Sequence, residues 1–306
     1  KPIKPEKISI DNKIEVSSDK TIKKSANIFT KKFQIKHLRT FGTSGSLHGQ
    51  FSSPRNLFFS NDRLLFISDT KNKRVQILDE FGTFISKIEF KSMLSPCCTL
   101  KDSDNTIFIL DSEDCKIRAF DNDYNCLFEF GGKGNSNYNL KSASSMTISE
   151  NNIIYVSDYE SKIIKVFTNR GIFLKNIGRE GEYKSPFSLS YINHRLFVLD
   201  NSIPKVQVNS KEGRALFSFG KRGANEGFFS VPRSISLDIF ENIYITDKLT
   251  HRIEIFDNNG NFIYQFGSKG IENGKFNEPE SISISDNLEI FVLDRMNSRV
   301  QVFKVE

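Results

Sequence analysis

The chain has 306 residues, of which 38% are hydrophobic, with 29 phenylalanines and no tryptophan. Its net charge is +6, and the first 36 residues account for all of it, since positions 37–306 hold 33 basic and 33 acidic side chains. We find no signal peptide, no apolar run long enough to cross a bilayer, and no cysteine spacing typical of a zinc site or a disulfide framework. These features exclude a disulfide-stapled secreted scaffold and favour a cytoplasmic protein without membrane contact.

Residues 1–36 are the first distinct segment. They are rich in lysine, serine and isoleucine, lack turn residues, and match nothing later in the chain. Such a composition is typical of linkers. We expect 1–36 to be a largely disordered linker and 37–306 to form one domain. Docking of the isoleucine and phenylalanine side chains of this segment on that domain is the alternative.

From residue 37 onward the chain repeats a unit of 42 to 47 residues six times. Each unit contains an aliphatic residue, an aromatic residue, an aliphatic residue, a variable position and an aspartate, at 65–69, 107–111, 154–158, 196–200, 243–247 and 290–294. In the fifth unit the pattern predicts four strands, at 234–237, 243–246, 252–256 and 262–266. Repeats of this length built from short strands are typical of β-propellers. We therefore predict an all-β, six-bladed β-propeller.

Both ends of the repeat region hold an incomplete unit. The sixth unit stops after its third strand, at Phe303, whereas residues 38–42 resemble a fourth strand without the other three. A propeller has no free sheet edge when its two ends complete one blade. We expect the N-terminal strand to join the last blade and close the ring.

The order of short motifs within each unit resembles the NHL repeat. A Phe-Gly pair precedes a loop with Phe-x-x-Pro, and the aspartate strand is followed by a base and alternating aliphatic residues. The first unit has Phe51-Ser52-Ser53-Pro54, Asp69 and Arg74-Val75-Gln76-Ile77, and units five and six match equally well. Unit three departs most, with Ala143 in place of the proline and Ile163 in place of the base.

Six NHL units behind a linker are similar to the C-terminal domains of TRIM-NHL proteins, the family that includes Brain tumor. Several of those propellers bind single-stranded RNA and repress messenger RNAs. The resemblance implies a post-transcriptional repressor in the cytoplasm or in ribonucleoprotein granules, with protein partners of messenger-RNA repression. The RING, B-box and coiled-coil motifs of that family are absent from this chain, so we assign it no ubiquitin-ligase activity.

The repeated aspartates are expected to be structural. Five of the six have arginine or lysine five residues later, so each can cap a turn and pair with that base. The four histidines lack the spacing of a metal site. We expect no catalytic residue, metal or cofactor, and a channel-metal lyase or hydrolase is the least favoured alternative.

Strand topology divides the loops between two faces. In an antiparallel four-stranded blade, the blade-to-blade loop and the second-to-third turn lie on one face, and the other two turns lie on the opposite face. The opposite-face turns contain 14 acidic and five basic residues, a net charge of −9. Because the propeller region is neutral, the remaining loops and strands are positive. We call the surface of blade-to-blade loops and second-to-third turns the basic face, and expect it to attract a polyanion.

Positions directly after the proline or directly after the aspartate are predicted to surround the central channel on the basic face. The post-proline positions hold Arg55, Cys97, Ser144, Phe187, Arg233 and Glu280. The residues expected to bind RNA are Arg55, Lys71, Lys73, Tyr138, Tyr159, Arg179, Phe187, Lys205, Lys221, Arg222, Arg233, Lys248, His251 and Arg295. Bases among them would hold phosphates, and flat side chains would stack on unpaired nucleobases, with uridine-rich single strands as the expected target.

A second interpretation makes the same face a protein-binding platform that recruits partners or substrates for a TRIM-type ubiquitin ligase. It rests on Ile203, Leu249 and Met296, which lie in second-to-third turns and would expose apolar side chains there.

Overall fold

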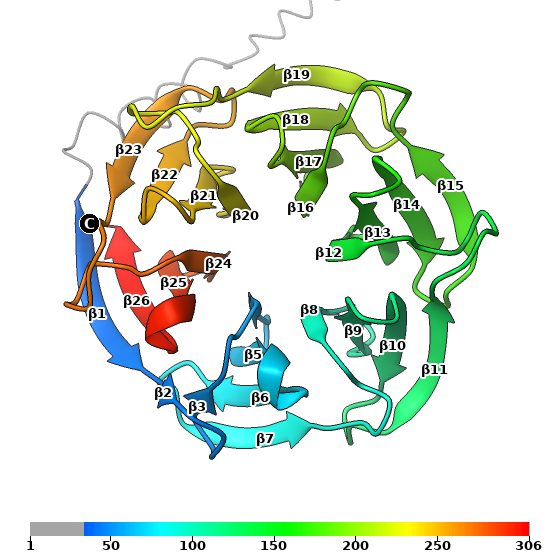
Figure 1. The fold of residues 1–306 in the computed structure, drawn as a ribbon, viewed down its shortest axis with the longest axis horizontal. Coiled ribbons are helices and arrows are strands. Elements are labelled where there is room, and N and C mark those ends of the chain that lie inside the picture. The colour runs from blue at the N-terminus through cyan, green and yellow to red at the C-terminus, as the bar shows by residue number, and fades with distance from the viewer. Residues whose placement is uncertain (1–33, 306) are drawn as a thin grey trace, which may run out of the picture. The chain divides into compact units, whose positions relative to one another are not determined.

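The computed structural model describes residues 34–305. Of the predicted linker 1–36, residues 1–33 lie outside this range, and Ile35 and Lys36 belong to the first strand. Six four-stranded antiparallel sheets stand around a common centre (Figure 1). Blade 1 consists of β4 (Asn56–Phe59), β5 (Leu64–Asp69), β6 (Arg74–Asp79) and β7 (Phe84–Ile88). Blade 2 consists of β8 (Pro96–Lys101), β9 (Ile107–Asp111), β10 (Lys116–Phe120) and β11 (Cys126–Gly131). Blade 3 consists of β12 (Ala143–Ile148), β13 (Ile153–Asp158), β14 (Ile163–Thr168) and β15 (Phe173–Ile177).

Blades 4 to 6 follow the same order. Blade 4 consists of β16 (Pro186–Ile192), β17 (Arg195–Asp200), β18 (Lys205–Ser210) and β19 (Ala215–Phe219). Blade 5 consists of β20 (Pro232–Leu237), β21 (Ile243–Asp247), β22 (Arg252–Phe256) and β23 (Phe262–Phe266). Blade 6 consists of β24 (Pro279–Ile284), β25 (Glu289–Asp294), β26 (Arg299–Val305) and β1 (Ile35–Phe41). A short parallel pair, β2 (Thr43–Ser44) and β3 (Gln50–Phe51), and two 3-10 turns, η1 (Thr70–Asn72) and η2 (Arg295–Asn297), complete the elements. The predicted all-β, six-bladed propeller is confirmed.

The ring closes through the N-terminal strand, as predicted. β1 pairs antiparallel with β26, from Ile35 opposite Val305 to Phe41 opposite Val300, and the two strands lie side by side in Figure 1. Arg39 Nη2 donates to the carbonyl of Glu80 in blade 1 at 2.8 Å and to Glu289 Oε2 in blade 6 at 2.7 Å. The closing strand therefore joins its own blade to blade 1.

The apolar pattern of each strand follows its position in the blade. Second strands are continuous apolar runs, such as β9, because the neighbouring blades cover both of their faces. Outer strands alternate between half-buried and exposed residues, as in β7, because only one of their faces packs on the protein. The core thus lies between the sheets.

The Phe-Gly motif allows the blade-to-blade loop to pack closely. Gly42 has φ +90°, and a Cβ there would lie 2.3 Å from a ring carbon of the fully buried Phe51. Gly220 and Phe229 repeat this arrangement with φ +89° and 2.3 Å. Glycine is required because the backbone is left-handed and the phenylalanine of Phe-x-x-Pro fills the space of its side chain.

The inner strands are joined to one another by side chains, which sequence reasoning missed. Two positions after the proline, or after Ala143 in blade 3, each inner strand has a polar or thiol side chain that accepts a backbone N–H of the next blade. The pairs are Asn56 with Thr99 (2.9 Å), Cys98 with Met146 (3.3 Å), Ser145 with Leu189 (3.2 Å), Ser188 with Ile235 (3.2 Å), Ser234 with Ile282 (3.3 Å) and Ser281 with Leu57 (3.1 Å). This inner collar forms a complete circle around the channel.

Candidate ligand-binding face

The repeated aspartates hold the loops of the basic face in place. Asp200 is fully buried, and its carboxylate accepts backbone N–H groups of Lys184 and Ser185 from the blade-to-blade loop and of Ser202 and Ile203 from the second-to-third turn, at 2.6 to 3.0 Å. Equivalent backbone bonds reach all six aspartates. Their expected structural role is consistent with this burial, because a buried carboxylate needs such donors.

The expected pairing with a base five residues later forms in two blades. Asp69 pairs with Arg74 and Asp294 with Arg299, each at 2.8 Å. In blade 5, Arg252 instead approaches Glu254. The predicted pairing of each aspartate with the base five residues later therefore does not hold in every blade. In blade 5, Glu254 on the third strand competes with Asp247 for Arg252.

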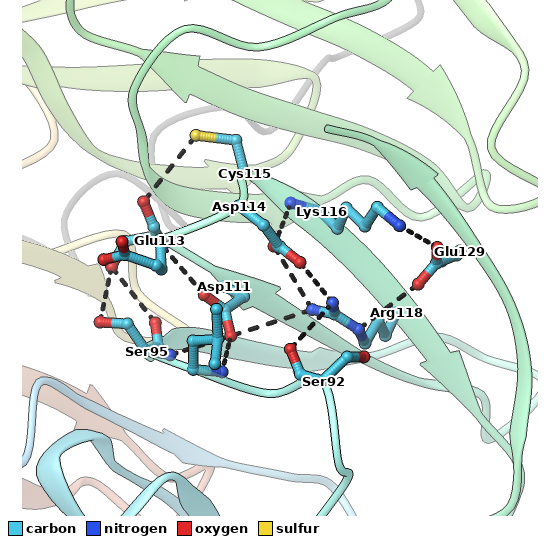
Figure 2. Close-up of polar contacts among 11 residues, drawn as sticks. Ser92, Ser95, Asp111, Glu113, Asp114, Cys115, Lys116, Arg118 and Glu129 are labelled. Carbon is cyan, nitrogen blue, oxygen red and sulfur yellow. Dashed lines mark hydrogen bonds and ion pairs between the residues drawn. The ribbon is translucent and has the colours of Figure 1, made fainter. Parts of the chain in front are cut away.

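Blade 2 shows the same competition in another form (Figure 2). Lys116, five residues after Asp111, pairs with Glu129 instead. The buried guanidinium of Arg118 lies 3.9 Å from Asp111, pairs with Asp114, and donates to the carbonyl of Ser92 at 3.2 Å. One arginine thus reaches both the repeat aspartate and the blade-to-blade loop.

A cavity of about 220 Å³ opens at the channel mouth on the basic face. All six post-proline residues line it, together with Ser112, Tyr159 and the inner collar. Arg55, Tyr159, Phe187 and Arg233, which lie in four different blades, are thereby brought to one site, as counting from the repeat predicted.

Arg233 is not a free cation. Its Nε and Nη2 donate to Glu280 Oε1 at 3.1 and 2.5 Å, and its guanidinium carbon lies 4.2 Å from the ring centre of Phe187. The arginine is therefore held between a carboxylate and an aromatic face, and one face of Phe187 is covered.

Glu280 leaves one acceptor unused in this cavity. Only 4% of the residue is exposed, and its Oε2 atom has no hydrogen-bond partner. Arg295 Nη1 lies 3.9 Å from that atom and 3.8 Å from Glu278, which also pairs with Lys248 at 3.1 Å. Glu278 and Glu280 thus partly neutralise the basic side chains at the channel mouth in blades 5 and 6. The sequence did not predict this pairing.

Arg55 belongs to a second cavity as well. This cavity of about 370 Å³ is lined by Arg55, Lys71, Lys73 and Arg295, with Glu113 as its one acid. Arg55 is exposed and donates only to Ser112 Oγ, at 3.3 Å, and within residues 34–305 neither it nor Lys71 nor Lys73 forms an ion pair. Blade 1 therefore carries unpaired positive charge beside the channel mouth.

The other predicted residues lie away from the channel mouth. Tyr138 lines an outer cavity between blades 2 and 3, and Arg179 lines one beside Lys184 in blade 3. Arg222 donates to the carbonyl of Ser202, and Lys221 lies over the ring of Phe228. Lys205 opens β18, and His251 Nδ1 accepts the backbone N–H of Glu278. These side chains lie in separate loops and do not form one site with Arg55.

Aromatic and apolar side chains are exposed on the same face. Tyr159 is 38% exposed, and its ring centre lies 6.3 Å from that of Phe187. The turn residues Ile203, Leu249 and Met296 are 43%, 64% and 55% exposed. Blades 4 to 6 therefore present apolar tips, whereas the corresponding turn of blade 1 presents Lys71 and Lys73.

No cluster of three or more metal-ligating side chains occurs within residues 34–305. Burial raises the pKa of Cys98 to about 11 and that of Cys97 well above its ordinary value, which disfavours the thiolate at both positions. No helix among the residues described is long and apolar enough to cross a membrane.

Comparisons with known proteins agree with the fold. The DUF5128 family, described as a 6-bladed beta-propeller, matches residues 237–306, which cover β21 to β23 and the first three strands of blade 6. No curated protein matches the chain significantly. The resemblance to NHL repeats therefore stays a prediction.

Solved structures with the same architecture are numerous, and three are described here. A protein of unknown function from Bacteroides thetaiotaomicron has a TM-score of 0.70 and 12% identity, over 90% of this chain and 77% of its own. Streptogramin B lyase and virginiamycin B lyase from Staphylococcus aureus each have a TM-score of 0.65 and 12% identity, over 90% of this chain and 98% and 100% of theirs. At this identity the similarity shows the six-bladed fold alone.

Proposed function

We propose that the basic face binds single-stranded RNA across the channel mouth. The main support is the position of Arg55, which lines both cavities. One of them also holds the side chains of Lys71 and Lys73, and the other holds Tyr159 and Phe187. A nucleic-acid strand needs cations for its phosphates and flat surfaces for its bases at neighbouring points. Only an unpaired nucleobase can leave its strand and enter such a cavity.

Glu280 supports a preference for uracil in the channel-mouth cavity. Its Oε2 is buried and has no hydrogen-bond partner, Arg233 pairs with its Oε1, and Arg295 Nη1 lies 3.9 Å from its Oε2. The imide edge of uracil has one N–H donor between two carbonyl acceptors, which complements an acceptor between two guanidinium groups. The exchangeable edges of adenine and cytosine lack this order.

On the resemblance to TRIM-NHL proteins, we further propose that the RNA-bound propeller represses messenger RNAs through protein partners in the cytoplasm. The proposed repression requires RNA-binding and protein-binding surfaces and no catalytic activity.

Fluorescence anisotropy with labelled oligouridine tests the RNA proposal. We expect binding that weakens steeply with salt and is much weaker for a duplex of the same length. Oligomers of N3-methyluridine, which lack the imide N–H, should bind more weakly than oligouridine. Binding that is absent or insensitive to salt would contradict the proposal, and equal binding of the methylated oligomer would contradict only the role of Glu280.

The exposed tips of Ile203, Leu249 and Met296 favour protein binding as a second candidate function. Apolar side chains contribute little to phosphate binding but are typical of protein contacts. A partner that co-purifies after ribonuclease treatment, and is lost on Leu249→Asp but not on Arg55→Ala, would support it. Loss of all partners on ribonuclease treatment would favour RNA as the ligand.

A further inference from the structure

Third strands carry a buried side chain seven residues after the repeat aspartate. In blade order these residues are Gln76, Arg118, Lys165, Gln207, Glu254 and Gln301. In blades 2 and 3, Arg118 donates to the carbonyl of Ser92 at 3.2 Å and Lys165 donates to that of Asn137 at 2.7 Å. This position thus supplies a hydrogen-bond donor to the blade-to-blade loop in blades 2 and 3, whereas Gln207 in blade 4 donates to the carbonyl of Phe217 on β19 at 3.0 Å.

Blades 1 and 6 show what an amide does at this position. Gln76 Nε2 donates to the carbonyl of Gln50 at 2.6 Å, while its Oε1 accepts the N–H of Gly49 at 3.0 Å. Gln301 repeats both bonds with Lys275 at 2.7 Å and Gly274 at 2.9 Å. Each amide therefore serves one donor and one acceptor of the loop.

Glu254 occupies this position in blade 5 and can make only half of the arrangement when ionised. It is fully buried, and its Oε2 accepts the N–H of Gly227 at 3.2 Å, as the glutamine oxygens do. Its Oε1 stands in place of the amide nitrogen and has no hydrogen-bond partner. Phe228 corresponds to Gln50 and Lys275, and within residues 34–305 its carbonyl receives no side-chain bond.

Further unpartnered atoms gather in the same blade. Thr250 Oγ1, Arg252 Nε and Gln265 Oε1 are buried without a hydrogen bond, and Gln265 on β23 is the strand partner of Glu254. Arg252 Nε lies 2.5 Å from Glu254 Oε1, so the guanidinium forms an ion pair with the carboxylate and opposes its protonation. Within residues 34–305, however, the loop carbonyl that the amides of blades 1 and 6 serve has no side-chain donor in blade 5, and a proton on Glu254 would supply one.

The surroundings of Glu254 favour its neutral form. Burial, opposed by Arg252 on its own strand and by the Gly227 N–H, and assisted by Asp247 at the end of β21, raises its pKa from 4.5 to about 7. Gln265 on the outer strand is uncharged. A carboxyl group in this setting titrates in the physiological range.

We propose that Glu254 is a proton-dependent link between β22 and the loop 220–231. When protonated, its Oε1–H donates to the carbonyl of Phe228, as the glutamine amides of blades 1 and 6 do to theirs. When Glu254 is ionised, that bond is lost and two acceptors face each other. The loop carries Lys221 and Arg222, so protonation orders two bases of the basic face.

The sign of the pH effect follows from the higher pKa in the folded protein. Between pH 4.5 and about 7 the folded state binds a proton that the unfolded chain has released. The contribution of Glu254 to stability is therefore fully present below pH 4.5 and is lost as the pH rises through about 7.

Urea unfolding of the wild type and Glu254→Gln between about pH 4 and pH 8 tests the link. The amide mimics the protonated state at every pH, so the ratio of wild-type to variant folding constants should fall as the pH rises, by up to about 300-fold. Parallel curves for the two proteins would overturn the proposal, because titration of all other groups cancels in the ratio.

Two further measurements keep the proposal testable if the variant folds poorly. In the wild type, hydrogen exchange at the Phe228 amide, corrected for intrinsic pH dependence, should be faster at pH 8 than at pH 6, while that at the equivalent Lys275 amide in blade 6 stays constant. The converse variant Gln301→Glu should transfer the pH dependence to Lys275. Equal behaviour of both amides in the wild type would overturn the proposal.

Discussion

Arg55 in blade 1 and Arg233 in blade 5 occupy the same position of the repeat, directly after the proline, and both line the channel-mouth cavity. Arg55 is exposed and meets only the hydroxyl of Ser112. Arg233 is fixed by Glu280 and covered by Phe187. The repeat position thus decides where a side chain lies, and neighbouring blades decide whether its charge is available to a ligand.

The difference extends over the basic face. Lys71 and Lys73 continue the unpaired charge of Arg55, whereas Lys248 and Arg295 share Glu278 in blades 5 and 6. Around the channel mouth the face therefore has a blade 1 sector with unpaired lysine and arginine side chains, and a sector of blades 4 to 6 in which Arg233, Lys248 and Arg295 are paired with glutamates and the turns carry apolar tips. A sequence count of basic residues treats these sectors as equal.

Replacing the blade 1 bases should have the largest effect on RNA binding. We expect the triple variant Arg55→Ala, Lys71→Ala and Lys73→Ala to bind oligouridine about 100-fold more weakly at moderate salt, because three phosphate contacts are lost. The slope of log affinity against log salt should become shallower by about 2, since each phosphate contact of a single strand contributes about 0.7. The matched variant Lys248→Ala, which removes a paired base, should change affinity far less; equal losses per residue would remove the distinction between the sectors.

Removing the paired arginine should act on stability instead. Arg233→Ala leaves the buried carboxylate of Glu280 without its main partner, and we expect a loss of about 2 kcal/mol in the free energy of unfolding. Arg55→Ala should change it by less than about 0.5 kcal/mol. Urea unfolding measures both.

The double variant Arg233→Ala with Glu280→Ala serves as the control for that prediction. It should recover part of the lost stability, because the unpaired charge is gone. Equal stability of Arg55→Ala and Arg233→Ala would show that the ion pair contributes nothing.

Replacing Tyr159 or Phe187 at the channel mouth should have smaller effects, on RNA binding in one case and on stability in the other. Tyr159→Ala should weaken oligouridine binding about fivefold without a change in stability, because the exposed ring offers a stacking surface. Phe187→Ala should mainly lower stability, since one face of its ring already contacts Arg233. Anisotropy and thermal unfolding of both variants provide the measurements, and a larger binding loss for Phe187→Ala would reverse the assignment.

Much of the architecture could be predicted because propeller repeats are local. Hydrophobic alternation and turn residues located the strands of blade 5 to within two residues, and the incomplete units at the two ends predicted the pairing of β1 with β26. The position after the proline also identified six residues that line the channel mouth, whereas of the positions after the aspartate only Ser112 and Tyr159 line it. The serines of the inner collar recur two positions after the proline or its Ala143 replacement, a signal present in the sequence but unremarkable without knowing that a neighbouring N–H faces each one.

The sequence by itself determined the number of blades, the closure of the ring and the face on which each loop lies, because strand length, turn chemistry and antiparallel order act within one unit. Only the tertiary structure decided that Glu280 pairs with Arg233, that Arg55 forms no ion pair within residues 34–305, and that Glu254 accepts a loop N–H where blades 1 and 6 use a glutamine. Most of these contacts join residues of different blades, or of a blade and the loop leading into it. Their energies depend on burial and distance, which no spacing along the chain expresses.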